Sequence, residues 1–258
     1  MGRFHRHADG TAHAGADHAH GDLAHGDLAH GDHSGYETGP LRVEVLESIL
    51  AENDRTAEAN AADFARAGVR VVNLMSSPGA GKTTLLAAVL GRIGAAAGRV
   101  GIVEGDIETS LDADRLGGFG AQVALVNTGH GFGGECHLDA TMVRAGLGQL
   151  DLDALDLLVI ENVGNLVCPA EFAVGETAKA MVYAVTEGEE KPRKYPVMFR
   201  TVELVIVNKI DLLEHLDFDL EMFLANLDAV NPGVRTILVS AKTGAGLDEV
   251  CGWLLDQG

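Results

Sequence analysis

Hydrophobic residues along the chain gather in short runs, and stretches with helical spacing separate several of these runs. The runs are rich in β-branched residues, which is typical of strands buried on both faces of a sheet. Alternation of such strands with helices predicts an α/β fold, with a mostly parallel sheet flanked by helices. Strands are expected at 69–75, 99–106, 121–128, 155–162, 181–187, 203–209 and 234–240, and helices at 83–94, 138–150, 219–229 and 246–256.

A further helix is predicted ahead of the first strand. Residues 41–67 contain neither glycine nor proline, and Leu46, Ile49 and Leu50 share one face at helical spacing. Gly68 follows directly and is expected to end the helix. The folded part of the chain is therefore expected to begin with this helix and to extend over residues 41–258.

The first 40 residues have a different composition. They contain almost no branched or aromatic side chains, so burial cannot offset chain entropy and the segment is expected to be disordered. Eight of the eleven histidines fall within the first 33 residues, several in a repeated A-H-G-D-L unit. Imidazole is a common ligand for nickel, zinc and copper, which favours a metal-binding tail over a purification tag or a compositional accident. The candidate tail ligands for nickel are His18, His20, His25, His30 and His33.

Charge and cysteine content narrow the function classes. The formal net charge of −19 argues against nucleic acid or an anionic membrane surface as the main partner. No apolar run reaches the roughly 18 residues that a membrane span needs. Three cysteines form an odd and sparse set, which gives no disulfide framework and favours the cytoplasm.

A phosphate-binding loop follows the first predicted strand. The sequence SSPGAGKTT over residues 76–84 matches G-x-x-x-x-G-K-[ST], with Ser76 in place of the leading glycine. Its glycines let backbone N–H groups face a polyphosphate at the start of a helix. Lys82 is expected to reach the β- and γ-phosphates, and the Thr83 hydroxyl to ligate Mg²⁺. The predicted cofactor-binding residues here are Gly79, Ala80, Gly81, Lys82, Thr83 and Thr84.

Two later motifs predict that the base is guanine. Asn208, Lys209 and Asp211 have the N-K-x-D spacing of GTP-binding proteins at the end of a predicted strand. The Asp211 carboxylate can accept hydrogen bonds from guanine N1–H and N2–H₂, which adenine lacks. The sequence Ser240-Ala241-Lys242 also ends a predicted strand and matches the second guanine element of the same proteins.

Acidic residues at two other strand ends are candidates for the chemistry of hydrolysis. Asp106 and Glu161 are expected to act with Lys82 in catalysis, and with Thr83 in holding Mg²⁺. Glu104 either reaches the same site or is a solvated strand end. Gly164 N–H is expected to sense the γ-phosphate, in the position of the D-x-x-G glycine. Asn165, rather than glutamine, comes next and predicts slow hydrolysis.

A second metal site is predicted from Cys136, His137 and Cys168. Two thiolates and an imidazole suit Zn²⁺ or Ni²⁺, although two buried cysteines and a core histidine would give the same pattern. Three ligands leave a fourth position for water or for another copy of the chain in a two-fold dimer. Cys168 lies four residues after Gly164, so metal affinity is expected to depend on the nucleotide, and the reverse. Cys251 lies on an amphipathic segment and is expected in the core.

Together these segments resemble the HypB family of hydrogenase nickel-incorporation GTPases, from about residue 41 to the C-terminus. The specific segments are ECHLDA and ENVGNLVCP, which lie within ECHLDATMV and IENVGNLVCPAEFAVGE. The resemblance implies a metallochaperone that dimerises, uses GTP, and loads nickel into the large subunit of [NiFe]-hydrogenase with a HypA-type partner. It also implies that Cys136, His137 and Cys168 form the switch-linked metal site, and that the tail stores nickel.

One departure and two alternatives remain. Some members of the family carry an N-terminal cysteine-rich nickel motif, and this chain has no cysteine before Cys136. The urease GTPase UreG shares the phosphate loop, but its metal motif is Cys-Pro-His, whereas cysteine and histidine are adjacent here. A nickel storage or buffer protein with a decayed GTP site is disfavoured by the intact Lys82, Thr83, Asn208 and Asp211.

Overall fold

The computed structural model describes the backbone of residues 5–6, 12–13, 40–106, 111–127, 137–166 and 168–255, with side chains at 48–105, 112–126, 137–166 and 169–255. The chain divides into the units Met1–Val43 and Glu44–Gly258. In the first unit, β1 (His5–Arg6) pairs antiparallel with β2 (Ala12–His13). The five histidines predicted as tail ligands lie outside the described residues. Most of the tail that was predicted to be disordered also lies outside them.

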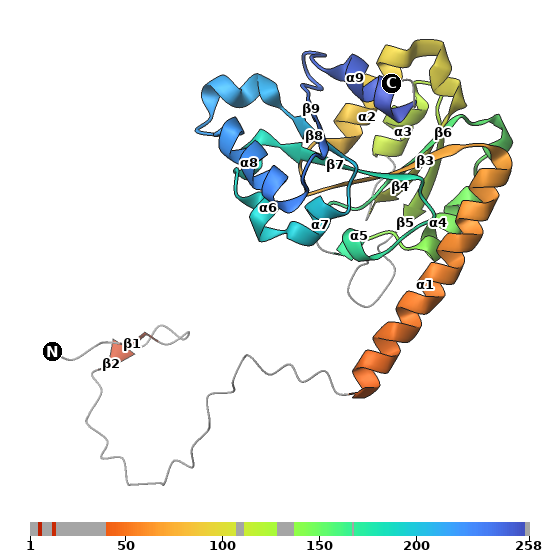
Figure 1. The fold of residues 1–258 in the computed structure, drawn as a ribbon, viewed down its shortest axis with the longest axis horizontal. Helices are drawn as coiled ribbons and strands as arrows, with labels where there is room; N and C mark the ends of the chain where they lie inside the picture. Colours follow the sequence, from red (N-terminus) through yellow and green to blue (C-terminus); the bar gives the residue numbers. More distant parts are fainter. Residues whose placement is uncertain are drawn as a thin grey trace, which may run out of the picture. The chain divides into compact units, whose positions relative to one another are not determined.

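The second unit contains a parallel sheet of seven strands in the order β5-β4-β6-β3-β7-β8-β9 (Figure 1). Strand β3 lies at the centre and pairs with β6 and β7, so the carboxyl ends of all three meet at one edge. Ligands of such sheets bind beyond this edge. The strands are β3 (Arg70–Ser76), β4 (Val100–Asp106), β5 (Gln122–Asn127), β6 (Leu157–Glu161), β7 (Ala178–Ala184), β8 (Leu204–Asn208) and β9 (Arg235–Leu238).

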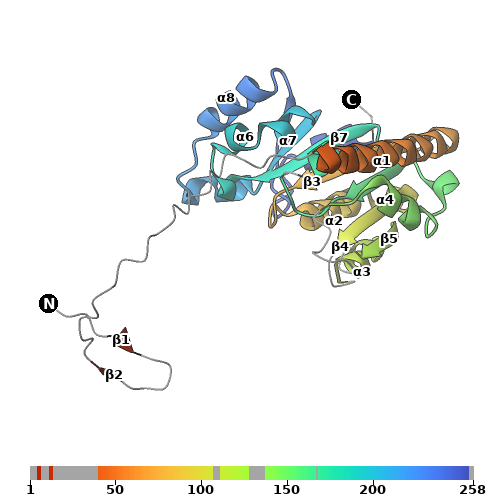
Figure 2. The ribbon, with the colours of Figure 1, turned by 90° about the horizontal axis from the view of Figure 1, so that it is seen from below.

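Helices cover both faces of the sheet (Figures 1 and 2). Alternate residues of β3 point to opposite faces. Val72 and Leu74 pack in one cluster with α2 (Lys82–Ile93), α3 (Leu111–Gly117) and α9 (Leu247–Leu254). Val71 packs with α1 (Pro40–Ala67) and α4 (Ala140–Leu147), and Met75 packs with α5 (Cys168–Glu171), α7 (Pro196–Arg200) and α8 (Leu220–Val230). The remaining segments are α6 (Lys191–Lys194) and four 3₁₀ turns, η1 (Gly94–Arg99), η2 (Leu152–Ala154), η3 (Val185–Glu187) and η4 (Ile210–His215).

The α/β fold with a parallel sheet is therefore confirmed, but one strand was misplaced. The strand predicted at 181–187 is β7, which starts at Ala178 and ends at Ala184. Its first residues, Ala-Lys-Ala, are not β-branched, so the start of the strand was predicted three residues too late. The carboxylate of Glu187 accepts from the Ala184 N–H at 3.0 Å and closes the end of the strand into a turn.

The N-terminal helix α1 covers the stretch from 41 to 67 and ends before Gly68, whose φ is +69°. Its buried residues are Asn53, Ala57, Asn60 and Phe64, which follow the helical repeat. Cys251 is 8% exposed in the core beside α2, so its prediction as a core residue is confirmed. Within the described ranges, no helix is long and apolar enough to cross a bilayer.

Candidate nucleotide and metal sites

The loop between β3 and α2 has the curled backbone that a phosphate cradle requires. Gly79 and Gly81 have φ values of +74° and +93°, a region that favours glycine. A side-chain carbon at Gly81 would lie 2.9 Å from the Asn208 amide nitrogen, so the loop and the guanine motif are in close contact. Helix α2 starts at Lys82, directly behind the loop, and its first backbone N–H groups face the loop.

Lys82 is held inside this loop as a buried cation. Its Nζ donates to the Ser76 hydroxyl at 2.6 Å, and that hydroxyl donates to the Ser77 carbonyl at 2.6 Å. Burial lowers the pKa of Lys82, and the nearby Glu161 carboxylate partly opposes this effect. A phosphate beside the ammonium group would relieve this desolvation. Ser76, which replaces the usual glycine, therefore positions the lysine.

A pocket of about 410 Å³ lies in front of this lysine. The Thr83 hydroxyl donates to Glu161 at 2.8 Å within it. A side-chain carbon at Gly164 would lie 3.0 Å from Pro78 Cα, so the backbone after β6 touches the phosphate loop. The lining residues are Pro78, Gly79, Lys82, Thr83, Glu104, Gly105, Asp112, Glu161, Asn162, Val163 and Gly164.

The acidic candidates differ in how the structure places them. Glu104 is 3% exposed and lines the pocket, so it is not a solvated strand end. Asp106 is the last residue of β4, and its side chain lies outside the described residues. Asp112, at the start of α3, also lines the pocket and was missed by sequence reasoning. No local motif marks Asp112, because it comes from a helix that was not predicted.

The guanine motifs meet around a second pocket of about 380 Å³. The Asn208 amide donates to the Ala80 carbonyl at 3.0 Å and accepts from the Ala241 N–H at 3.2 Å. Lys209 donates to the Gly79 carbonyl at 2.6 Å. The lining residues are Gly81, Thr84, Asn208, Lys209, Asp211, Leu212, Ala241 and Lys242. Gly79 and Lys82 line the first pocket and Gly81 lines the second, so both pockets border the same loop. A single nucleotide can therefore extend through both.

The Asp211 carboxylate is kept ionised in this second pocket. The Ser240 hydroxyl donates to its Oδ1 at 2.6 Å. This hydrogen bond is the main cause that holds the pKa of Asp211 below its usual value, and Lys242 and Lys209 add to it. An ionised carboxylate accepts only, which is the chemistry that guanine N1–H and N2–H₂ need.

Of the three predicted nickel or zinc ligands Cys136, His137 and Cys168, only His137 has a described side chain. Its ring lies 4.2 Å from the ring of Phe172, measured between centroids. Phe172 directly follows α5, which begins at Cys168. The side chain of Cys168 and the whole of Cys136 lie outside the described residues. The structure therefore brings together the two segments that carry these cysteines, and the ligand set itself stays a prediction.

The segment that begins at His137 is hydrogen-bonded to a residue of the phosphate pocket. Asn162, directly after Glu161, is 1% exposed. Its side-chain oxygen accepts from the Leu138 N–H at 2.9 Å and from the Val163 N–H at 3.0 Å. A side-chain carbon at Gly105 would lie 2.8 Å from Leu138 Cγ, so β4 also packs closely against the residue after His137. Asn162 was not singled out from the sequence, because its partner is 24 residues away.

The chain is similar to known proteins in both sequence and fold. A family model described as the CobW/HypB/UreG nucleotide-binding domain matches residues 70–238. The chain is 47% identical over 215 residues to the hydrogenase maturation factor HypB of Escherichia coli K12, covering 83% of this chain and 72% of that protein. The crystal structure of HypB from Archaeoglobus fulgidus has a TM-score of 0.72 at 38% identity, covering 80% of this chain and 98% of that one. HypB from Helicobacter pylori, solved in complex with nickel, has a TM-score of 0.73 at 34% identity, covering 80% and 94%.

Proposed function

We propose, from the premise that the chain belongs to the HypB family of hydrogenase maturation factors, that it is a GTP-hydrolysing nickel metallochaperone for [NiFe]-hydrogenase. The observation that carries this proposal is the position of Asn162. Its backbone continues from Glu161 in the nucleotide pocket, and its side chain holds Leu138, next to His137. Asn162 thus connects the proposed nucleotide site with the proposed metal site.

In the nucleotide pocket, the chain's own groups supply binding and charge. Lys82 neutralises the β- and γ-phosphates, and Gly164 N–H faces the γ-phosphate. The Thr83 hydroxyl and the Glu161 carboxylate are hard oxygen donors 2.8 Å apart, which fits Mg²⁺, with Asp106 as a further ligand. The ion would neutralise charge that develops on the phosphate oxygens. Asp106 and Glu161 orient the attacking water, and slow turnover follows from Asn165 in place of glutamine.

The cargo site is formed by Cys136, His137 and Cys168 and accepts nickel, or zinc at rest. The contact of the His137 ring with Phe172 supports this proposal, because Phe172 lies four residues after Cys168. Water or a second copy of the chain supplies the fourth ligand. Loss of the γ-phosphate moves Gly164 and Asn162, and the shift of Leu138 weakens the grip on the cation.

The proposed delivery route runs in the cytoplasm, from the tail through the folded domain to the hydrogenase large subunit, with a HypA-type chaperone as partner. The nickel in the Helicobacter pylori structure and the hydrogenase maturation name of the Escherichia coli relative support this direction. GTP and nickel both favour a homodimer in this proposal. The name of the Escherichia coli relative supports hydrogenase as the destination.

We expect Asp211→Ala to lower the affinity for GTP by about 100-fold, because two hydrogen bonds to an ionised acceptor are lost. ATP should then bind about as well as GTP. Isothermal titration with each nucleotide measures both affinities. The matched control is Asp217→Ala, an exposed aspartate in the following segment, which should leave both unchanged. A variant that still prefers GTP strongly over ATP would refute the assignment of the guanine pocket.

The histidine-rich tail favours nickel storage as a second function of the same chain. Removal of residues 1–39 leaves α1 complete and should reduce the number of nickel ions bound per chain, with GTP hydrolysis unchanged. Equilibrium dialysis with NiCl₂ and a phosphate-release assay measure the two quantities. If hydrogenase maturation then stops in low-nickel medium and excess nickel restores it, storage is the main function of the tail.

A further inference from the structure

Two buried asparagines of α1 each hydrogen-bond to both segments that carry the proposed cysteine ligands. Asn53 accepts from the Ala140 N–H and donates to the Ala173 carbonyl, each at 2.9 Å. Asn60 donates to the Ala140 carbonyl at 2.9 Å and to the Val174 carbonyl at 3.1 Å. The two asparagines are seven residues apart and therefore lie on one face of the helix. Helix α1 thus links residue 140, which follows Cys136, to residues 173–174, which follow Cys168.

Each asparagine needs both ends of its amide group. Asn53 is 6% exposed and Asn60 is fully buried, so a lost bond would leave a backbone group unpaired in the interior. The oxygen of Asn60 accepts from Arg144 at 3.0 Å, so its two N–H groups are directed at the two carbonyls. Aspartate would lack the donors and leucine would lack both functions. The oxygen and the nitrogen of both side chains each have a hydrogen-bond partner already.

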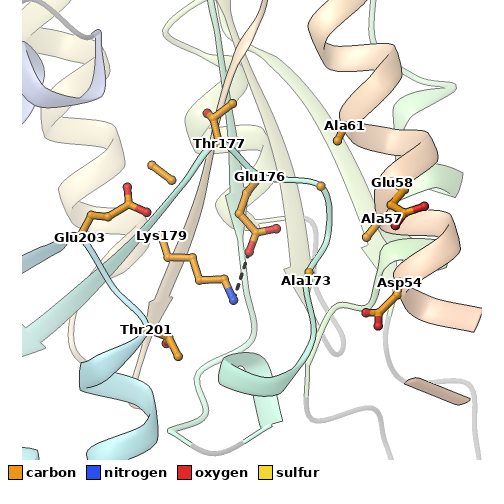
Figure 3. A pocket seen from close by; sticks show the side chains of 12 residues that line it. Asp54, Ala57, Glu58, Ala61, Ala173, Glu176, Thr177, Lys179, Thr201 and Glu203 are labelled. Atoms are coloured by element: carbon orange, nitrogen blue, oxygen red, sulfur yellow. Dashed lines mark ion pairs between the residues drawn. The ribbon is translucent and has the colours of Figure 1, made fainter. Parts of the chain in front are cut away.

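Residues 173–176, which follow Cys168, pack closely against α1 and are hydrogen-bonded to it. A side-chain carbon at Gly175, whose φ is +98°, would lie 2.8 Å from the Ala57 carbonyl oxygen. Figure 3 shows α1 beside this segment at a cleft of about 520 Å³, with the Glu176 carboxylate directed towards Lys179. Glu176 accepts from the Val174 N–H at 2.7 Å and pairs with Lys179 at 3.4 Å, which fixes the other side of the segment.

A buried path closes this network at the nucleotide site. Asn162 donates to the Asn73 side-chain oxygen at 3.3 Å, and Asn73 donates to Glu176 at 3.4 Å. Asn162 also binds Leu138, so hydrogen bonds connect residues 138–140, the end of β6, β3, residues 173–176 and α1 in a ring. A ring of this kind fixes the spacing of its members, because no single segment can move without breaking a buried bond.

We propose that Asn53 and Asn60 are positioning residues for the metal site, and this inference rests on the proposed function. Ala140 lies four residues after Cys136, and Ala173 lies five residues after Cys168. By tying these two alanines to one rigid helix, the asparagines set the separation of the two cysteine-bearing segments. Nickel affinity therefore depends on α1, although the helix contributes no ligand.

The test is Asn53→Ala in the full-length protein, with Asn226→Ala as the matched control. Asn226 is a buried asparagine of α8 that is 7% exposed, and it donates to the Glu189 carbonyl at 2.9 Å rather than to residues 140 or 173–174. Titration with NiCl₂ is followed by thiolate-to-nickel charge-transfer absorption, which reports cysteine-bound nickel and excludes nickel on tail histidines. We expect about tenfold weaker nickel binding for Asn53→Ala, a typical cost of losing a residue that orients metal ligands without binding the metal, and no change for Asn226→Ala.

The possible outcomes separate the two levels of the proposal. Unchanged nickel affinity in Asn53→Ala, or an equal loss in Asn226→Ala, overturns the positioning role. If the wild-type protein shows no charge-transfer band, the proposed cysteine site fails instead. Should Asn53→Ala not fold, Asn53→Asp keeps the acceptor for Ala140 and loses only the donor to Ala173. Weaker nickel binding in that folded variant supports the role, and wild-type affinity overturns it.

Discussion

Replacement of Lys82 by alanine is expected to slow GTP hydrolysis by about 100- to 1,000-fold, the usual cost of removing one preorganised donor from a charge-stabilising site. The ammonium group is buried against Ser76, 2.6 Å away, so it is already oriented before the nucleotide binds. Lys209 cannot replace it, because its amine is bonded to the Gly79 carbonyl on the guanine side of the loop. A single-turnover assay of phosphate release measures the loss.

The control for this variant is Lys194→Ala. Lys194 forms an exposed ion pair with Glu190 at 2.9 Å, far along the chain from the phosphate loop, and its loss should leave hydrolysis unchanged. Hydrogenase activity in cells should fall with hydrolysis in Lys82→Ala. Normal maturation by a Lys82→Ala variant would instead favour a nickel buffer over a GTP-driven chaperone.

Replacement of Cys136 and Cys168 together by alanine is expected to abolish nickel delivery to hydrogenase. Two of three proposed ligands are lost. Nickel affinity at this site should therefore fall by more than the roughly 100-fold that loss of a residue orienting the ligands can cost. GTP hydrolysis should persist, because Lys82, Thr83 and Glu161 are untouched. Hydrogenase activity in cells and the charge-transfer absorption of the purified protein measure the two effects.

Cys251 provides a control for the loss of a cysteine as such. It is 8% exposed in the core beside α2, and burial raises the pKa of its thiol, so it stays neutral. Cys251→Ala should lower stability slightly and leave nickel binding and delivery unchanged. Wild-type delivery by the double variant would show that the cysteine site is not on the delivery route.

Most of the strands could be predicted from the sequence because each contains a short run of apolar residues, many of them β-branched, as in VRVVNLM. The phosphate loop and the guanine motifs were accessible because each is a short contiguous pattern with one chemical purpose. The family resemblance rested on the same segments and is confirmed by the comparisons. Strand β7 was misplaced where its first residues are alanine and lysine, which carry little strand signal.

The asparagine network could not be predicted in the same way. Asn53 reaches a carbonyl 120 residues further along the chain, and Asn60 reaches one 114 residues away. A single asparagine side chain on a helix produces no recognisable sequence pattern. Its partners are backbone groups, which every residue supplies. At 53 and 60 the helical repeat indicates only that polar residues face the core, which is itself a sign of satisfied buried hydrogen bonds.

The most direct test of the proposed coupling is the nickel affinity of the full-length protein, measured by charge-transfer absorption with Mg²⁺–GDP and with a non-hydrolysable GTP analogue. Cys136→Ala/Cys168→Ala serves as the background. Coupling through Asn162 predicts that nickel binds about 5- to 150-fold more tightly with the GTP analogue, the usual range for linked sites. Equal affinities with the two nucleotides would contradict it.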